Sequence, residues 1–381
     1  MSHQRIPRLS KSSKLYIIKL LAGSCITLVI SFTFFYLIKS DPKFPYLINN
    51  LVITNFQKCV YPNEINNLID IYNEDDILHK RNKLIQYIWK QKELPNLESP
   101  VIETNIIDNR YSNLETVKQI DKLTINMTYK VNSVAYHFHA LEPNNKLVIY
   151  HESHTGDFIK GYDTIKKLLS NGYDVVALSM PLLGMNNQPE IEIFEKGLVK
   201  FTSHNQFKLL DNKSFSSIKY FIEPVLVAIN YAETLDYKEI NMVGVSGGGW
   251  TTVLASAIDP RISKSYSIAG TYPLYLRSKQ CGENIPGDYE QTDSNLYKNA
   301  NYLELYVLDS YGSGRRHTQI INVYDPCCFS GRKYKSYESI VSRRMELLDE
   351  GDFTIFADDT HNKHTLSETG LDFIIRDLEL Q

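Results

Sequence analysis

The stretch Gly244-Val245-Ser246-Gly247-Gly248-Gly249 decides the fold of this chain. A short apolar run, 240–245, precedes the serine, and residues 250–258 after it have the character of a helix. A serine hydroxyl is a poor nucleophile unless a base takes its proton, and a sharp strand-to-helix turn can present it only where flanking residues lack side chains. Gly244 and Gly248 satisfy that requirement. The stretch therefore predicts that Ser246 is a nucleophile on such a turn.

Phosphate-binding loops are the alternative for a glycine-rich turn between a strand and a helix. Such loops contain a lysine in the pattern GxxxxGK[ST], or glycines spaced as GxGxxG. Neither pattern occurs around Ser246. The residues therefore favour the nucleophile over a phosphate site.

The pattern outward from this turn predicts an α/β fold with a mostly parallel, doubly wound sheet. Short apolar runs are typical of strands buried on both faces of a parallel sheet, and helices between them provide the crossovers. Alternating apolar residues from 120 to 140 indicate an antiparallel pair at the N-terminal edge. Two irregular insertions, 183–217 and 271–316, are typical of lids or binding loops. The predicted strands are 147–150, 173–178, 240–245, 265–269, 319–323 and 353–356, and the predicted helices are 158–170, 218–235, 250–258 and 302–311.

The segment around Ser246 resembles the nucleophile elbow of the α/β-hydrolase superfamily, and the order of strands is similar from about Leu123 to the C-terminus. The resemblance is to its esterase branches, such as the acetyl-ester and dienelactone hydrolases. It implies that an acid follows the next-to-last strand and that a histidine follows the last one.

Residues of both kinds stand in those places. Asp325 follows the run 319–323, and Asp309, in a helical stretch before that run, is the fallback for the acid. An Asp before a Pro is also a common turn residue. His361 and His364 both follow the last run. His364 resembles the family's base more closely because it lies just before the final helix, for which Ser367 is the predicted N-cap, whereas His361 is the alternative base or a brace for the loop.

An oxyanion hole requires two backbone N–H groups directed at the developing negative charge. The family resemblance assigns one to Gly247, the residue after the nucleophile. The second is expected from the loop Tyr150-His151-Glu152-Ser153-His154-Thr155-Gly156, with the N–H of Ser153 as the candidate. Glu152 stands where the family usually has a glycine.

The expected reaction is acyl transfer to water through a Ser-His-Asp triad, with a small-molecule or acylated ester as substrate and without a cofactor. An amidase or peptidase of the same fold is the first alternative. The second is a catalytically inactive hydrolase fold used for binding. Nucleic acid is not an expected partner, because the net charge of the 381 residues is -3 and the body of the chain has no basic stripe.

A metal ion is not expected from the sequence either. Histidine pairs occur at His137 and His139, at His151 and His154, and at His361 and His364, but the chain has no HExxH motif. Packing and hydrogen bonding in loops explain such histidines more simply.

The N-terminus predicts a single membrane anchor. Basic residues in 1–19 precede an apolar run, 20–38, that contains no charged residue and is about as long as a spanning helix. Bulky residues end the run, so we interpret it as an uncleaved signal anchor, with the body of the chain on the non-cytoplasmic side. A stalk and a helical segment at 39–119 would then precede the catalytic domain, 120–381.

Four cysteines follow the predicted anchor. They are Cys59, Cys281, Cys327 and Cys328. An exported domain is compatible with one or two disulfides among them, whose pairing the sequence does not define.

Overall fold

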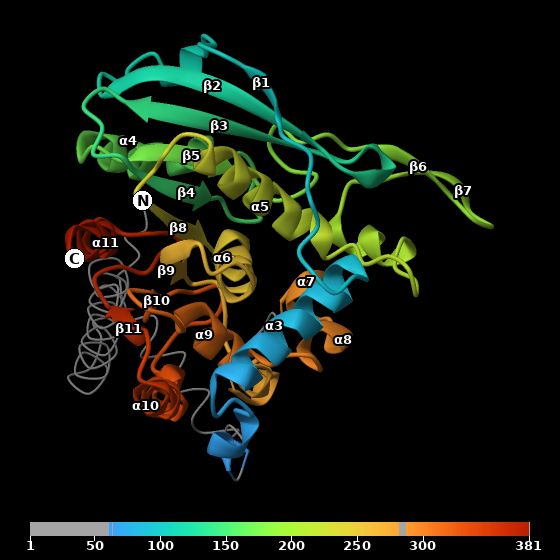
Figure 1. The fold of residues 1–381 in the computed structure, drawn as a ribbon, viewed down its shortest axis with the longest axis vertical. Coiled ribbons are helices and arrows are strands. Elements are labelled where there is room, and N and C mark those ends of the chain that lie inside the picture. The colour runs from blue at the N-terminus through green and yellow to red at the C-terminus, as the bar shows by residue number, and fades with distance from the viewer. Residues whose placement is uncertain (1–60, 63, 282–286, 381) are drawn as a thin grey trace, which may run out of the picture. The chain divides into compact units, whose positions relative to one another are not determined.

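A computed structural model describes residues 61–62, 64–281 and 287–380 (Figure 1). They fall within one compact unit, 57–381. The predicted anchor at 20–38 and its basic flank lie outside the described residues. Within the described part of the chain, no helix combines the length and apolar character that a membrane span requires.

The centre of the unit is a nine-stranded sheet in the order β1-β2-β3-β5-β4-β8-β9-β10-β11. The six strands from β5 to β11 run parallel to one another, whereas β1, β2 and β3 are antiparallel at one edge. The predicted parallel sheet with an antiparallel N-terminal edge is therefore confirmed. The strands are β1 (Val101–Glu103), β2 (Val117–Asn126), β3 (Asn132–Ala140), β4 (Lys146–His151), β5 (Asp174–Leu178), β8 (Glu239–Val245), β9 (Ile262–Ile268), β10 (Arg316–Asn322) and β11 (Asp352–Asp358).

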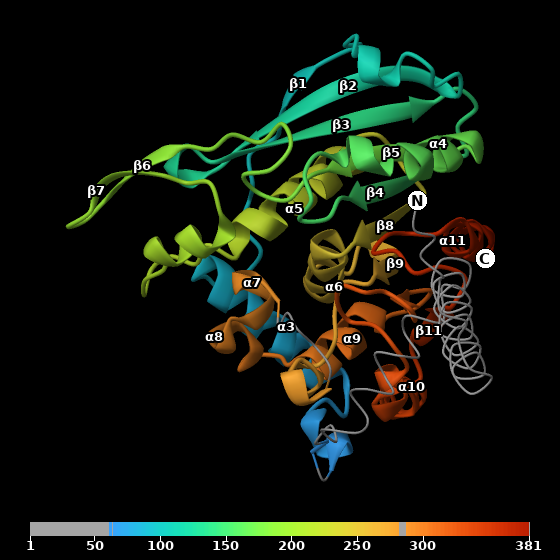
Figure 2. The same cartoon turned by 180° about the vertical axis from the view of Figure 1, so that it is seen from behind.

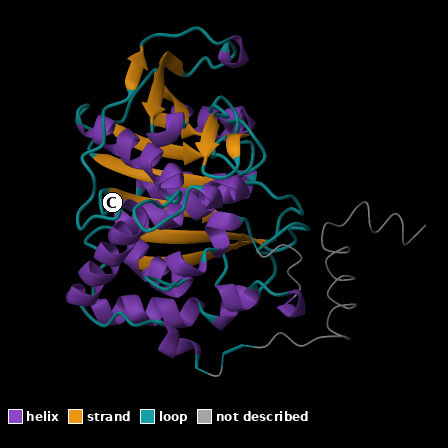
Figure 3. Ribbon diagram, turned by 90° about the vertical axis from the view of Figure 1, so that its right-hand side faces the viewer, coloured by secondary structure: helices purple, strands orange, loops and turns teal. Residues whose placement is uncertain are grey.

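Helices cover both faces of this sheet (Figure 3). Alternate residues of β4 explain the two layers: Leu147 and Ile149 face a core shared with α3, α5, α6, α9 and α10, and Val148 and Tyr150 face one shared with α4 and α11. Helix α6, which follows the Ser246 turn, is buried along its whole length. The helices are α3 (Glu74–Trp89), α4 (Tyr162–Ser170), α5 (Lys219–Glu233), α6 (Gly247–Ile258), α7 (Tyr289–Thr292), α8 (Ser294–Tyr297), α9 (Tyr302–Ser310), α10 (Glu338–Leu348) and α11 (Glu368–Glu379).

The insertions contain regular structure that the sequence pattern did not predict. The first forms a hairpin of β6 (Glu190–Ile193) and β7 (Gly197–Lys200), which projects away from the sheet in both views of the ribbon (Figures 1 and 2), followed by the 3-10 helix η5 (His204–Leu209). The second contains the short helices α7 and α8. Strand β1 and helix α10 were also missed, because three exposed residues and a mostly polar helix carry little periodic signal.

A polar network holds the antiparallel edge to the parallel sheet. The Asp174 carboxylate accepts hydrogen bonds from the Ala140 N–H at 2.8 Å and from the Tyr237 hydroxyl at 2.5 Å. His139 lies between two carboxylates, with Nε2 2.9 Å from Asp121 Oδ2 and Nδ1 3.5 Å from Asp174 Oδ2. Burial alone would lower the pKa of His139, but these two carboxylates outweigh it and raise the pKa above 6.5.

The raised pKa of His139 predicts a pH-dependent contribution to stability. A histidine whose pKa is raised by folding stabilises the protein fully below its unfolded pKa and loses this effect as the pH rises through the folded value. We therefore expect the stability difference between the wild type and His139→Gln to shrink as the pH rises from about 5 to about 9. Urea unfolding of both proteins across this range measures the difference. A difference that does not change with pH would show that the charge of His139 contributes nothing.

Candidate active site

Ser246 lies at the end of β8, immediately before α6, with φ 55° and ψ -115°. A positive φ is unfavourable for a residue that carries a side chain, and such strain persists only where the surrounding structure enforces it. Here the Ser246 N–H donates to the Ile268 carbonyl at 2.8 Å, and the Ser246 carbonyl accepts from the Trp250 N–H at 3.0 Å. The predicted sharp strand-to-helix turn is present, and the Ser246 side chain is half-buried.

Close backbone packing explains the glycines of this turn. A Cβ on Gly244 would lie 2.1 Å from the Gly248 carbonyl oxygen, and one on Gly248 would lie 2.1 Å from the carbonyl oxygen of His151. Neither oxygen belongs to a side chain that can rotate away. The turn therefore packs directly against the loop that follows β4.

The structure brings His364 and Asp325 together. His364 Nδ1 lies 2.6 Å from Asp325 Oδ2. The other carboxylate oxygen of Asp325 accepts from the Cys327 N–H at 2.7 Å, so this residue forms a turn and also binds a histidine. Asp325 is buried, whereas His364 is half-buried. Both follow strands that end at the same edge of the parallel sheet as β8.

The two alternative residues have other partners. His361 Nε2 lies 3.3 Å from Asp358 Oδ2, and its Nδ1 accepts from the Lys363 N–H at 3.1 Å, which are contacts within its own loop. Asp309 is buried on α9, where its carboxylate lies 2.7 Å from His317 Nδ1 near the beginning of β10. Since β10 runs away from His317 toward the edge that carries Asp325, Asp309 lies at the opposite end of that strand.

The candidate oxyanion donors differ in their surroundings. Gly247 is the first residue of α6, so its N–H has no acceptor within the helix. The Ser153 N–H, in contrast, donates to Glu152 Oε1 at 2.8 Å. Glu152 Oε2 in turn accepts from the Tyr150 hydroxyl at 2.8 Å. The glutamate that replaces a glycine in this loop therefore occupies the donor expected from Ser153.

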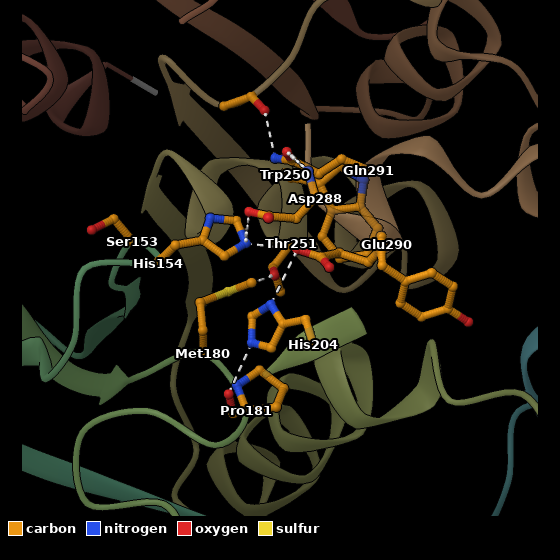
Figure 4. Close-up of polar contacts among 12 residues, drawn as sticks. Ser153, His154, Met180, Pro181, His204, Trp250, Thr251, Asp288, Glu290 and Gln291 are labelled. Atoms are coloured by element: carbon orange, nitrogen blue, oxygen red, sulfur yellow. Dashed lines mark hydrogen bonds and ion pairs between the residues drawn. The ribbon is translucent and has the colours of Figure 1, made fainter. Parts of the chain in front are cut away.

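Two functional candidates were missed by the sequence analysis, namely His204 and Glu290. They meet His154 beside the Ser246 turn, and the three side chains point toward one another (Figure 4). Burial alone would raise the pKa of Glu290, but His204 and His154 outweigh it and hold this pKa well below its ordinary value of 4.5. Both residues lie in the insertions, where no sequence spacing relates them to His154.

Three of the cysteines after the predicted anchor are disulfide-bonded. Cys327 and Cys328, neighbours in the chain, are joined to each other directly after the turn at Asp325. Cys281 is disulfide-bonded as well.

Comparison with known proteins identifies the fold. No family model and no curated protein sequence matches the chain. An acetyl xylan esterase from Paenibacillus sp. R4 is similar in structure, with a TM-score of 0.55, 14% identity, and coverage of 84% of this chain and 99% of that one. A second acetyl xylan esterase, from Thermoanaerobacterium sp. JW/SL YS485, has a TM-score of 0.52 at 12% identity, with coverage of 83% and 97%. A glucuronoyl esterase from Solibacter usitatus has a TM-score of 0.52 at 14% identity, with coverage of 79% and 90%.

These likenesses extend over most of both chains, and they confirm the fold that the sequence resemblance implies. The chain has an α/β-hydrolase fold of the kind found in esterases.

The packing of the turn predicts the effect of adding a methyl group. We expect Gly244→Ala to lower the free energy of unfolding by about 3 kcal/mol or more, because the new Cβ would overlap backbone atoms that cannot repack. Gly197→Ala is the matched control, since its φ is +71° but no atom lies within 4 Å of the added Cβ, and backbone strain alone costs about 1 to 2 kcal/mol. Urea unfolding of both variants measures the two effects. Equal losses would contradict the packing argument.

Proposed function

We propose that this protein is a serine ester hydrolase that works through Ser246, His364 and Asp325. The hydrogen bond between His364 and Asp325 carries the proposal, because it joins two loops at the sheet edge where the strained Ser246 turn also lies. A carboxylate bound to Nδ1 leaves Nε2 of the imidazole as the base. That arrangement is the one a serine nucleophile needs.

The proposed reaction has two halves. His364 Nε2 takes the proton of the Ser246 hydroxyl while its oxygen attacks the carbonyl carbon of the ester, and the imidazolium then protonates the departing alcohol. Water, deprotonated by the same nitrogen, attacks the acyl carbon; the bond to the Ser246 oxygen breaks, the imidazolium returns the proton to that oxygen, and the acid leaves. Asp325 fixes the tautomer of His364 and stabilises the imidazolium. No step needs a cofactor.

The Gly247 N–H is the first proposed donor to the oxyanion. Ser153 is the proposed second donor, and it becomes available when the carboxylate of Glu152 leaves its N–H. Each such donor is worth roughly 3 kcal/mol of transition-state stabilisation. The proposal therefore requires that the substrate oxygen displace the Glu152 carboxylate from the Ser153 N–H.

An ester is the preferred substrate class, because the similar structures include enzymes named as esterases and share this arrangement of strands. An amidase or peptidase would use the same three residues. The presence of a bonded His364–Asp325 pair argues against an inactive fold used only for binding.

We also propose that 20–38 anchors the protein in a membrane, with the hydrolase domain on the non-cytoplasmic side. The support is an uncharged apolar run of spanning length after a basic flank. The full chain should stay in the membrane pellet after alkaline carbonate extraction, and a chain without residues 1–40 should not. In intact cells, added protease should digest the body of the full chain. Digestion only after the cytosol is opened would contradict the orientation.

Substitution of Ser246 tests the catalytic proposal. We expect Ser246→Ala to lower hydrolysis of 4-nitrophenyl acetate by about 10⁴-fold or more, and to abolish labelling by a fluorophosphonate probe. Asp325→Asn should lower the ester rate by about 10⁴-fold, because it stabilises the wrong tautomer of His364. Hydrolysis of 4-nitroacetanilide at a comparable rate would favour the amidase alternative.

The two histidines provide a matched pair of variants. His364→Ala should lose fluorophosphonate labelling, whereas His361→Ala should retain most of it, because His361 pairs with its chain neighbours Asp358 and Lys363 and not with Asp325. Circular dichroism checks that both variants are folded. The opposite result would make His361 the base, and a folded wild type that does not label would refute the serine mechanism.

A further inference from the structure

Side chains from three separate segments meet beside the Ser246 turn. His154 comes from the loop after β4, His204 from η5 in the first insertion, and Glu290 from α7 in the second. Each contributes one nitrogen or oxygen atom, and these three atoms lie within 4.8 Å of one another (Figure 4). Two imidazoles and a carboxylate are ligands that bind divalent transition metals.

Glu290 is buried in a way that its known hydrogen bonds do not explain. The residue is 0% exposed, and its Oε1 lies 2.6 Å from His154 Nε2. Its Oε2 has no hydrogen-bond partner among the described residues. A buried carboxylate oxygen without a partner is costly, so it indicates that a further group binds there.

His204 is oriented as a metal ligand would be. Its Nε2 donates to the Pro181 carbonyl at 2.9 Å, so in the neutral imidazole the lone pair lies on Nδ1. Nδ1 lies 3.5 Å from Glu290 Oε1. Metal-binding histidines usually donate their second ring N–H to a carbonyl or carboxylate in this manner. The buried imidazole is therefore held with its free nitrogen toward the carboxylate.

Asp288 lies beside these three residues and offers a second carboxylate. Its Oδ2 lies 3.1 Å from His154 Nε2, and its side chain is 48% exposed, which leaves a path from solvent. A tetrahedral zinc ion with bonds of about 2.1 Å holds its ligand atoms about 3.4 Å apart. The separation between His204 Nδ1 and Glu290 Oε1 already has this value within 0.1 Å. The separation between His154 Nε2 and Glu290 Oε1 is only 2.6 Å, so it must widen when the ion replaces the proton between them.

We propose that His154, His204, Glu290 and Asp288 form a binding site for a divalent transition metal ion, with zinc as the best match. Two neutral imidazoles and two carboxylates balance the charge of the ion. The ion would join both insertions to the loop after β4. This loop packs directly on the Ser246 turn. The contact is so close that a Cβ on Gly247 would lie 2.4 Å from His154 Nδ1. The site therefore holds the insertions in place beside Ser246.

Two other clusters of similar composition are less suited to metal. In the cluster of Asp121, His137 and His139, both ring nitrogens of His137 are engaged by tyrosine hydroxyls, at 3.2 and 2.9 Å. In the cluster of Cys327, Cys328 and His364, the two sulfur atoms are joined in a disulfide. Neither cluster offers an unpartnered buried carboxylate oxygen like that of Glu290.

Direct measurement of zinc binding tests the proposal. Protein stripped with a chelator is dialysed against zinc, and bound metal is counted per chain by elemental analysis. We expect one ion per chain in the wild type and a rise in Tm with zinc. Loss of an outer hydrogen-bond partner weakens metal binding roughly 10- to 100-fold. Glu290→Gln and His204→Asn remove direct ligands, so each should weaken zinc binding by more than that. His139→Asn changes the cluster of Asp121, His137 and His139 instead, so it should bind zinc as the wild type does.

The outcomes separate this proposal from ester hydrolysis, because none of them depends on activity. A folded wild type that binds no stoichiometric zinc overturns the site, and so does binding that is lost in His139→Asn but kept in Glu290→Gln. If a ligand variant fails to fold, X-ray absorption of the zinc-loaded wild type decides. Two imidazoles with oxygen ligands support the site, and sulfur ligands overturn it.

Discussion

The close contact between the Ser246 turn and the loop after β4 is the constraint on which the rest of the site depends. Backbone carbonyls of that loop lie where side chains on Gly248 would be, and the ring of His154 lies where one on Gly247 would be. The strained backbone of Ser246 is tolerated because strands and helix α6 hold it from both sides. The same contact places the loop with the proposed Ser153 donor next to the proposed nucleophile.

The sequence was informative where the physics is local or repeats along the chain. The glycines around Ser246, the six apolar runs and the place of Ser367 before α11 follow from backbone packing, burial and capping, and each has a counterpart in the structure. The pairing of Asp325 with His364 was predicted through the family resemblance, since the two residues lie 39 positions apart. The resemblance supplied an order that spacing alone did not contain.

The sequence was least informative where distant segments meet. His204 and Glu290 are 86 positions apart (290 − 204), and both belong to insertions whose course the central sheet does not determine. The pairing of the Ser153 N–H with Glu152 is local, but the other oxygen of the same buried carboxylate is held by the Tyr150 hydroxyl, which no sequence pattern indicates. Strand β1 was missed because its pairing with β2, rather than any pattern of its own, makes it a strand.

The position of β11 at the edge of the sheet distinguishes the loop that carries His364 from the turn that carries Ser246. This strand pairs with β10 on one side only, so the loop that carries His364 leaves from an edge, whereas β8 is flanked by β4 and β9. The loop after an edge strand is bordered by a neighbouring loop on one side only, whereas the Ser246 turn has neighbours on both. A change in the course of the His364 loop therefore displaces less of the structure than the same change at the Ser246 turn, whose glycines already lie against backbone carbonyls. In the proposed mechanism, new specificity has more freedom to evolve on the side of His364 than on the side of Ser246.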